Sequence, residues 1–129
     1  LPPNAVHACT DITGFGLAGH GTEMARASGV TLEIGFEKLP FFDGVVEIAA
    51  NNRPGGLLTN QEHFSHGVNG KMPANDYLIY DPQTSGGLLV AVSEDSAQIA
   101  EAALQADGRS VWRIGRAIPA VPGTHVHMV

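Results

Sequence analysis

Short apolar runs with two different periods follow one another along the chain, and they predict strands mixed with helices. Residues 30–34 alternate between apolar and polar side chains, which predicts a strand with one side facing solvent. Residues 87–92 are continuously apolar, which predicts a strand buried on both faces. Residues 5–10, 110–114 and 124–128 are predicted as three further short strands.

Helical spacing is present in three segments. Residues 17–28 carry a narrow stripe of mostly small side chains, and Gly29 is placed to end that helix. Residues 43–50 predict a short helix, whereas residues 94–107 predict a longer one with Ser93 as its N-cap. Strands and helices do not alternate strictly, so the pattern predicts a mixed α and β domain rather than a chain of βαβ units.

Length and composition fit one compact domain over residues 1–129, without repeats. Hydrophobic residues make up 43% of the chain, and no apolar run approaches the ~20 residues that cross a bilayer, so we expect no membrane segment. Residues 53–75 show no period, which predicts a long loop that is functional or mobile. The chain begins at Leu1, and we expect it to belong to a longer protein. The larger aromatic side chains are predicted to lie in the core: Phe36, Phe41, Phe42 and Trp112.

The charge balance and the cysteine content restrict the partners and the compartment. Seven Lys and Arg against thirteen Asp and Glu give a formal net charge of −6, which argues against a nucleic-acid partner. Arg109, Arg113 and Arg116 are too few to form a phosphate track. The single cysteine, Cys9, excludes an internal disulfide and is predicted as a small buried side chain. A cytoplasmic protein is expected.

A glycine-rich motif occupies residues 10–20 (TDITGFGLAGH), between a predicted strand and a predicted helix. It contains G-x-G-x-x-G, and Glu33 lies near the place of a ribose-binding acid, so a dinucleotide-binding fold is one interpretation. Against it, the preceding strand is short and too little chain follows for two mononucleotide-binding halves.

Asp11, just before these glycines, makes a metal–phosphate site the more consistent functional interpretation. A carboxylate and a phosphate charge about 4 Å apart repel by roughly 4 kcal/mol at an effective dielectric constant of about 20. A Mg²⁺ ion between the two reverses the sign. The amides of Gly14 and Gly16 would then donate to the phosphate, and Thr10 and Thr13 would add hydroxyls. The alternative is structural: Asp11 or Thr13 caps the following helix, and the glycines allow close packing.

Residues 81–87 (DPQTSGG) form a second candidate motif. Their exposed amides would suit an anion, but a tight turn leading into the following strand explains them more simply. The histidine pairs His63/His66 and His125/His127 have no third ligand at a metal-binding spacing, so we expect no zinc site there.

Three segments resemble one known family. Residues 6–20 (VHACTDITGFGLAGH), followed by residues 23–25 (EMA), resemble the opening of the C-terminal domain of selenophosphate synthetase (selenide, water dikinase). Residues 81–89 (DPQTSGGLL) resemble the second hallmark of that family, and residues 54–56 (PGG) with Asn60 lie between the two. The resemblance extends over essentially the whole chain and places it in the aminoimidazole ribonucleotide synthetase-like superfamily.

The resemblance implies an α+β domain, with a mixed β-sheet layered against helices. It implies the C-terminal domain of a two-domain enzyme that converts ATP, selenide and water to selenophosphate, AMP and orthophosphate. By this resemblance Asp11 is a Mg²⁺ ligand, and Thr13, Gly14 and Gly16 lie near the ATP phosphates. The reactive cysteine or selenocysteine belongs to the N-terminal domain, so Cys9 is not that residue and no catalytic residue is expected here.

The resemblance also implies partners. The full-length protein is expected to be a homodimer that assembles mainly through its N-terminal domain, whereas this chain alone is expected to be inactive and monomeric. Many members carry basic residues before the asparagine at position 60; residues 57–59 (LLT) replace them, so no phosphate contact is assigned there. The alternative function is a non-catalytic nucleotide- or partner-binding module of the same fold.

Overall fold

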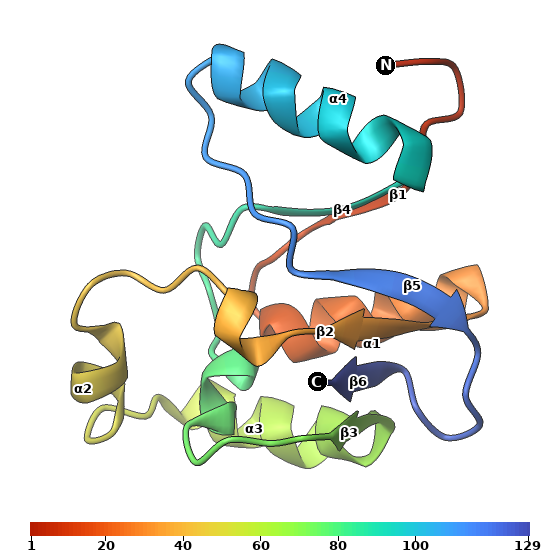
Figure 1. The fold of residues 1–129 in the computed structure, drawn as a ribbon. Helices are drawn as coiled ribbons and strands as arrows, with labels where there is room; N and C mark the ends of the chain where they lie inside the picture. The colour runs from red at the N-terminus through yellow and green to blue at the C-terminus, as the bar shows by residue number, and fades with distance from the viewer.

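The computed structural model describes residues 1–129 and contains six β-strands, four α-helices and three short 3-10 helices (Figure 1). None of the helices has the length and apolar character needed to span a bilayer. In chain order the elements are β1 (Val6–Asp11), α1 (Gly16–Ser28), β2 (Val30–Ile34), η1 (Phe36–Lys38), α2 (Val45–Ala49), α3 (Gly55–Phe64), η2 (Ser65–Gly67), β3 (Val68–Gly70), η3 (Asp76–Tyr80), β4 (Leu88–Val92), α4 (Glu94–Ala106), β5 (Gly115–Pro119) and β6 (Val126–Met128).

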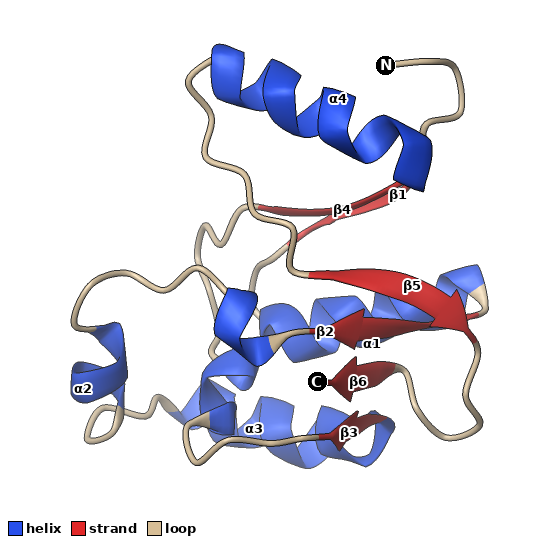
Figure 2. Ribbon diagram, in the orientation of Figure 1, coloured by secondary structure: helices blue, strands red, loops and turns tan.

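The strands form two separate sheets (Figure 2). One is a four-stranded mixed sheet in the order β3-β6-β2-β5, with β6 parallel to β2 and β3, and β5 antiparallel to β2. The other is an antiparallel ribbon of β1 and β4, with Asp11 opposite Leu88. In Figure 1, α1 and α3 lie behind the four-stranded sheet, and the ribbon lies between that sheet and α4. The predicted α+β class, a mixed sheet layered against helices, is confirmed.

The core lies between the four-stranded sheet and the helical segments α1, α3 and η3. Tyr80, Leu57 and Ile79 are among its most completely buried large side chains. Each such side chain stabilises the fold by ~1.5–3 kcal/mol relative to an exposed one. The ribbon, α2 and α4 contribute no side chain to this core. Its members are Ala18, Ala25, Leu32, Ile34, Phe36, Leu57, Phe64, Val68, Tyr77, Ile79, Tyr80, Val126 and Met128.

Several predicted elements are confirmed by the structure, with shifts of one or two residues at their ends. They are the strands predicted at 5–10, 30–34, 87–92 and 124–128 and the helices predicted at 17–28, 43–50 and 94–107. Gly29 ends α1 in the left-handed conformation, with φ 64°. Its N–H donates to the carbonyls of Ala25 and Arg26, which satisfies orphan acceptors at the helix end.

Two predicted segments are wrong. Residues 53–75 are not a loop but hold α3, η2 and β3. The helix α3 follows Pro54 and begins with two glycines, which are typical of loops. Its buried stripe of Leu57, Asn60 and Phe64 includes a polar residue, so the helical period of apolar side chains is weak in the sequence. The strand predicted at 110–114 is displaced, because pairing with β2 begins only at Gly115.

Burial also differs from prediction at four kinds of position. Leu88 on β4 is 70% exposed, since no further layer packs over its side chain on the two-stranded ribbon. Thr31, predicted on the solvent side of β2, is fully buried, and its hydroxyl donates to the Thr124 carbonyl at 2.7 Å. Cys9 is exposed rather than buried. Among the aromatic side chains predicted in the core, Phe36 is buried, whereas Phe41, Phe42 and Trp112 are exposed.

Candidate functional site

The two motifs found in the sequence meet in the structure as one double loop, which we define as residues 11–16 and 81–87. The segment after β1 and the segment before β4 run side by side because the two strands pair. Ile12 N–H donates to the Gly87 carbonyl at 2.9 Å, and Gly86 N–H donates back to the Ile12 carbonyl at 3.0 Å. Gln83 N–H adds a third bond, to the Thr13 carbonyl, at 3.1 Å. Segments about 70 residues apart in sequence are thereby fixed to each other.

Asp11 is exposed at the end of β1, and its carboxylate makes no hydrogen bond or ion pair within the chain. The structural alternative for this residue is wrong. The N-cap of α1 is Phe15, and no side chain caps that helix, because neither Asp11 nor Thr13 reaches its first amides. A carboxylate without a partner on a fixed loop is available to a cation.

Thr13 is half-buried and is tied to His20 on α1. Its Oγ1 lies 3.0 Å from Nε2 of His20, and the backbone N–H of Phe15 donates to the same Nε2 at 3.4 Å. Because a backbone N–H only donates, the network assigns Nε2 as the acceptor and the ring proton to Nδ1. The Thr13 hydroxyl then donates to His20, which leaves lone pairs on its oxygen for a cation or for a donor.

The two glycines of the first motif have different environments. Gly14 is exposed, nothing lies within 4 Å of a Cβ added there, and its amide makes no hydrogen bond within the chain. Gly16 is buried with φ +68°, and its N–H donates to the Thr13 carbonyl at 3.0 Å. A Cβ at Gly16 would lie 2.8 Å from the Ile79 carbonyl oxygen. Gly14 therefore offers a free amide, whereas Gly16 allows close packing of η3.

The second segment of the double loop contributes a partly desolvated carboxylate. Burial raises the pKa of Asp81 above its ordinary value, and Gln83 Nε2 donates to its Oδ2 at 2.5 Å. Next to it, burial first and the charge of Asp76 second raise the pKa of Tyr80 to about 12, so this phenol stays protonated at neutral pH. The amides of Gln83 and Gly86 point to the first motif, which supports a docked turn rather than an anion nest.

The oxygen donors at the double loop suit a hard cation such as Mg²⁺, which is usually bound by one or two carboxylates together with substrate phosphates. Asp11 supplies a free carboxylate and Thr13 a hydroxyl oxygen. No group of three or more His, Cys, Asp and Glu side chains is close enough to hold a metal by itself. Asp11 and Thr13 alone would therefore not complete the coordination of a cation.

The dinucleotide-binding interpretation is wrong. β1 and β2 belong to different sheets, so α1 does not connect two parallel strands of a βαβ unit. Glu33, the candidate ribose ligand, accepts a hydrogen bond from Arg116 Nε at 2.7 Å. The other two arginines of the C-terminal region also pair with carboxylates, Arg109 with Asp107 and Arg113 with Glu101.

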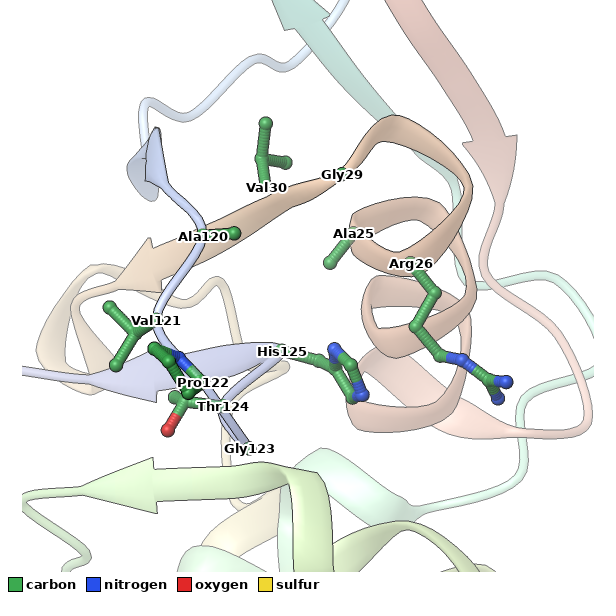
Figure 3. Close-up of a pocket in the computed structure, with 10 residues that line it drawn as sticks. All are labelled: Ala25, Arg26, Gly29, Val30, Ala120, Val121, Pro122, Gly123, Thr124 and His125. Carbon is green, nitrogen blue, oxygen red and sulfur yellow. The ribbon is translucent and has the colours of Figure 1, made fainter.

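A groove of about 420 Å³ lies at the other end of α1 (Figure 3). It is formed by the end of α1, the start of β2 and the turn before β6, with Arg26 and His125 at its side. The 13 residues of α1 separate it from Gly16 by roughly 20 Å at 1.5 Å per residue. This separation excludes the groove from the double loop. Arg26 in the last turn is explained by its favourable interaction with the helix dipole.

Asn60 is the residue of this region whose role sequence reasoning missed. It lies on α3, is 7% exposed, and donates hydrogen bonds to the carbonyls of Gly14 and Tyr80. The resemblance includes Asn60 but assigns it no role, and the other available signal was its place between two apolar residues, Leu57 and Phe64, at spacings of three and four.

Comparisons with known proteins identify relatives of this chain. The family model described as AIR synthase related protein, C-terminal domain, matches residues 1–127. The selenide, water dikinase of Bdellovibrio bacteriovorus is 41% identical over 123 residues, which cover 90% of this chain and 34% of that protein. The enzyme of the same name from Aeromonas hydrophila is 44% identical over 113 residues, or 86% of this chain and 32% of that protein. The chain thus spans about a third of the length of these relatives.

A solved structure supports the fold. The crystal structure of thiamine-monophosphate kinase from Stenotrophomonas maltophilia matches 95% of this chain and 31% of that chain, with a TM-score of 0.56. At 18% sequence identity this likeness shows the fold alone.

Proposed function

Because the chain belongs to the family described as AIR synthase related protein, C-terminal domain, we propose that it is the C-terminal domain of a selenophosphate synthetase and contributes Asp11 to a Mg–ATP site. Relatives named selenide, water dikinase, 41–47% identical to it, support this assignment. The observation that carries it is the unpaired, exposed carboxylate of Asp11 on a loop held by three backbone hydrogen bonds.

The electrostatics decide how Asp11 acts. Without a cation, its carboxylate would repel each phosphate charge about 4 Å away by roughly 4 kcal/mol at a dielectric constant of about 20. Magnesium, when bound, supplies the positive charge that joins the carboxylate to the triphosphate. Thr13, two residues further along the same segment, keeps oxygen lone pairs free because its proton is donated to His20. The free amide of Gly14 supplies a donor for a phosphate oxygen.

The remainder of the reaction belongs to the rest of the protein. The full-length enzyme would convert ATP, selenide and water to selenophosphate, AMP and orthophosphate, as a cytoplasmic homodimer. Gly16 serves this site by close packing, since its amide is engaged with Thr13. The purified 129-residue chain is expected to form no AMP from ATP and selenide, because it lacks most of the length of its relatives.

Asp11→Asn in the full-length protein tests the proposal. We expect an intact fold and an at least about tenfold higher Mg²⁺ concentration for the half-maximal rate. The reason is that the amide oxygen carries no net charge to attract the cation. The measurement is initial rate against Mg²⁺ concentration, with circular dichroism to check folding. The matched control is Asp107→Asn, which removes a carboxylate 74% exposed at the end of α4. Unchanged Mg²⁺ dependence in Asp11→Asn would contradict the assigned role.

A further inference from the structure

Asn60 lies where α3 meets both segments of the double loop. It is buried, and its Nδ2 donates to the Gly14 carbonyl at 2.8 Å and to the Tyr80 carbonyl at 2.9 Å. The Gly14 carbonyl belongs to the first segment, between Asp11 and α1, whereas the Tyr80 carbonyl directly precedes the second segment. The two acceptors are 46 and 20 residues away from Asn60 along the chain. One side chain therefore joins three parts of the fold.

The chemistry at this position requires a primary amide. A single nitrogen with two N–H groups satisfies both carbonyls at once, which no hydroxyl or carboxylate of similar size does. The bond to the Tyr80 carbonyl is buried and the bond to the Gly14 carbonyl is partly buried, so an acceptor left without a partner is costly, above all at Tyr80. In the first turn of α3, a Cβ added at Gly56 would lie 3.2 Å from Cγ of Pro82. The helix therefore also packs closely against the second segment. α3 thus serves as the support against which the double loop is held.

We propose that Asn60 is a positioning residue for the cation–phosphate site. It holds the two segments of the double loop at a fixed separation, and thereby sets where Asp11 and Gly14 present their carboxylate and amide. This inference rests on the proposed function of Asp11. A displacement of about 1 Å at such a site is enough to change rates by about a hundredfold, so a residue that touches no substrate can still control binding.

Asn60→Asp in the full-length protein is the principal test. The substitution keeps the shape but replaces two donors with carboxylate oxygens that face two carbonyls, so the double loop should separate from α3. We expect the KM for Mg–ATP to rise at least about tenfold, and the amides of Gln83 and Gly86 to exchange with deuterium at least about tenfold faster. If Asn60→Asp does not fold, Asn60→Ser, which retains one donor, decides the question with a smaller rise in both quantities.

Thr31→Val is the matched control. Thr31 is also buried and also makes two hydrogen bonds to backbone groups, but it lies in β2 and joins the turn before β6. We expect this variant to lower the Tm while leaving the KM and the exchange of Gln83 and Gly86 unchanged. If the Asn60 variants do only the same, Asn60 is merely structural and the inference is overturned.

The Asp11→Asn variant separates this inference from the proposed function. Altered Mg²⁺ dependence in Asp11→Asn together with unchanged KM and exchange in the Asn60 variants overturns the positioning role alone. Unchanged Mg²⁺ dependence in Asp11→Asn overturns the proposed function. It also overturns the positioning role of Asn60 for that function, even where the exchange of Gln83 and Gly86 is accelerated.

Discussion

Two regions of this molecule bury their apolar side chains to very different extents. We call the four-stranded sheet with α1, α3 and η3 the body, and the ribbon of β1 and β4 with α4 the arm (Figure 1). All but one of the thirteen core side chains come from the elements of the body, and the remaining one is Phe36 of η1. In α4 only Ser96 is buried, and Leu88 of β4 is 70% exposed.

The difference shows what holds the candidate site in place. Asp11 is the last residue of a strand in the arm, yet the loop that follows it is fixed by the body, through Asn60 and the close packing of Gly16. The position of the site therefore depends on the body as well as on the pairing of β1 with β4 in the arm. Substitutions matched in chemistry but placed in the two regions test this comparison.

Leu57→Ala in the body and Leu104→Ala in the arm should give the largest contrast. Leu57 is 1% exposed and Leu104 is 44% exposed, so only the first substitution leaves a cavity. We expect Leu57→Ala to lower the free energy of unfolding by about 2–5 kcal/mol, and Leu104→Ala to change it by less than about 0.5 kcal/mol. Urea denaturation at constant m-value measures both. Equal losses would show that the arm is packed as tightly as the body.

Gly16→Ala should have the next largest effect, because Gly16 joins the site to the body. Alanine in the left-handed conformation at φ +68° is strained, and its Cβ would also meet the backbone of residues 79–81. We expect a loss of about 2–3 kcal/mol in the free energy of unfolding.

Gly29→Ala is its matched control. Gly29 has φ +64° but nothing within 4 Å of an added Cβ, so only the conformational strain of about 1 kcal/mol applies. The difference between the two variants, measured by urea denaturation, isolates the contact with η3. Equal losses would mean that this contact adjusts without cost.

Elements with strong local signals could be predicted from the sequence. α1 follows from a narrow stripe at helical spacing and β2 from an alternation of period two, and the end of α1 follows from Gly29, which adopts the left-handed conformation there. α3 was missed because its inward stripe contains Asn60, whose burial depends on two carbonyls distant in sequence. β4 was predicted with the wrong burial, since an apolar run says nothing about whether another layer covers it.

The same distinction applies to the site. The motif around Asp11 singled out that residue because a carboxylate beside free amides needs a cation to meet a phosphate. The sequence could not predict that residues 81–87 lie against this motif, because the pairing of β1 with β4 brings them together. Nor could it distinguish Gly14 from Gly16, since only the fold shows that one is open and the other packed.

Asp81→Asn should change the free energy of unfolding least of all these variants. It tests whether the side chains of the double loop are desolvated, as in the body, or solvated, as in the arm. Burial raises the folded-state pKa of Asp81, so the folded protein holds this proton more tightly than the unfolded chain. Its stabilising contribution is complete below the ordinary value of 3.8 and is lost as the pH rises through the raised pKa. At pH 7 the ionised carboxylate is therefore destabilising, and the substitution removes that cost.

We accordingly expect Asp81→Asn to be more stable than the wild type at pH 7, by less than about 0.5 kcal/mol, because the carboxyl is only half-buried and screened by solvent. In the variant the asparagine Oδ1 can still accept a hydrogen bond from Gln83 Nε2, so the bond seen at 2.5 Å in the wild type is retained without the charge. Urea midpoints should differ at pH 7 and converge below pH 4 as the wild-type carboxyl takes up its proton. A variant that is less stable at pH 7 would instead mean that a positive charge stabilises the ionised carboxylate, and that the double loop resembles neither the body nor the arm.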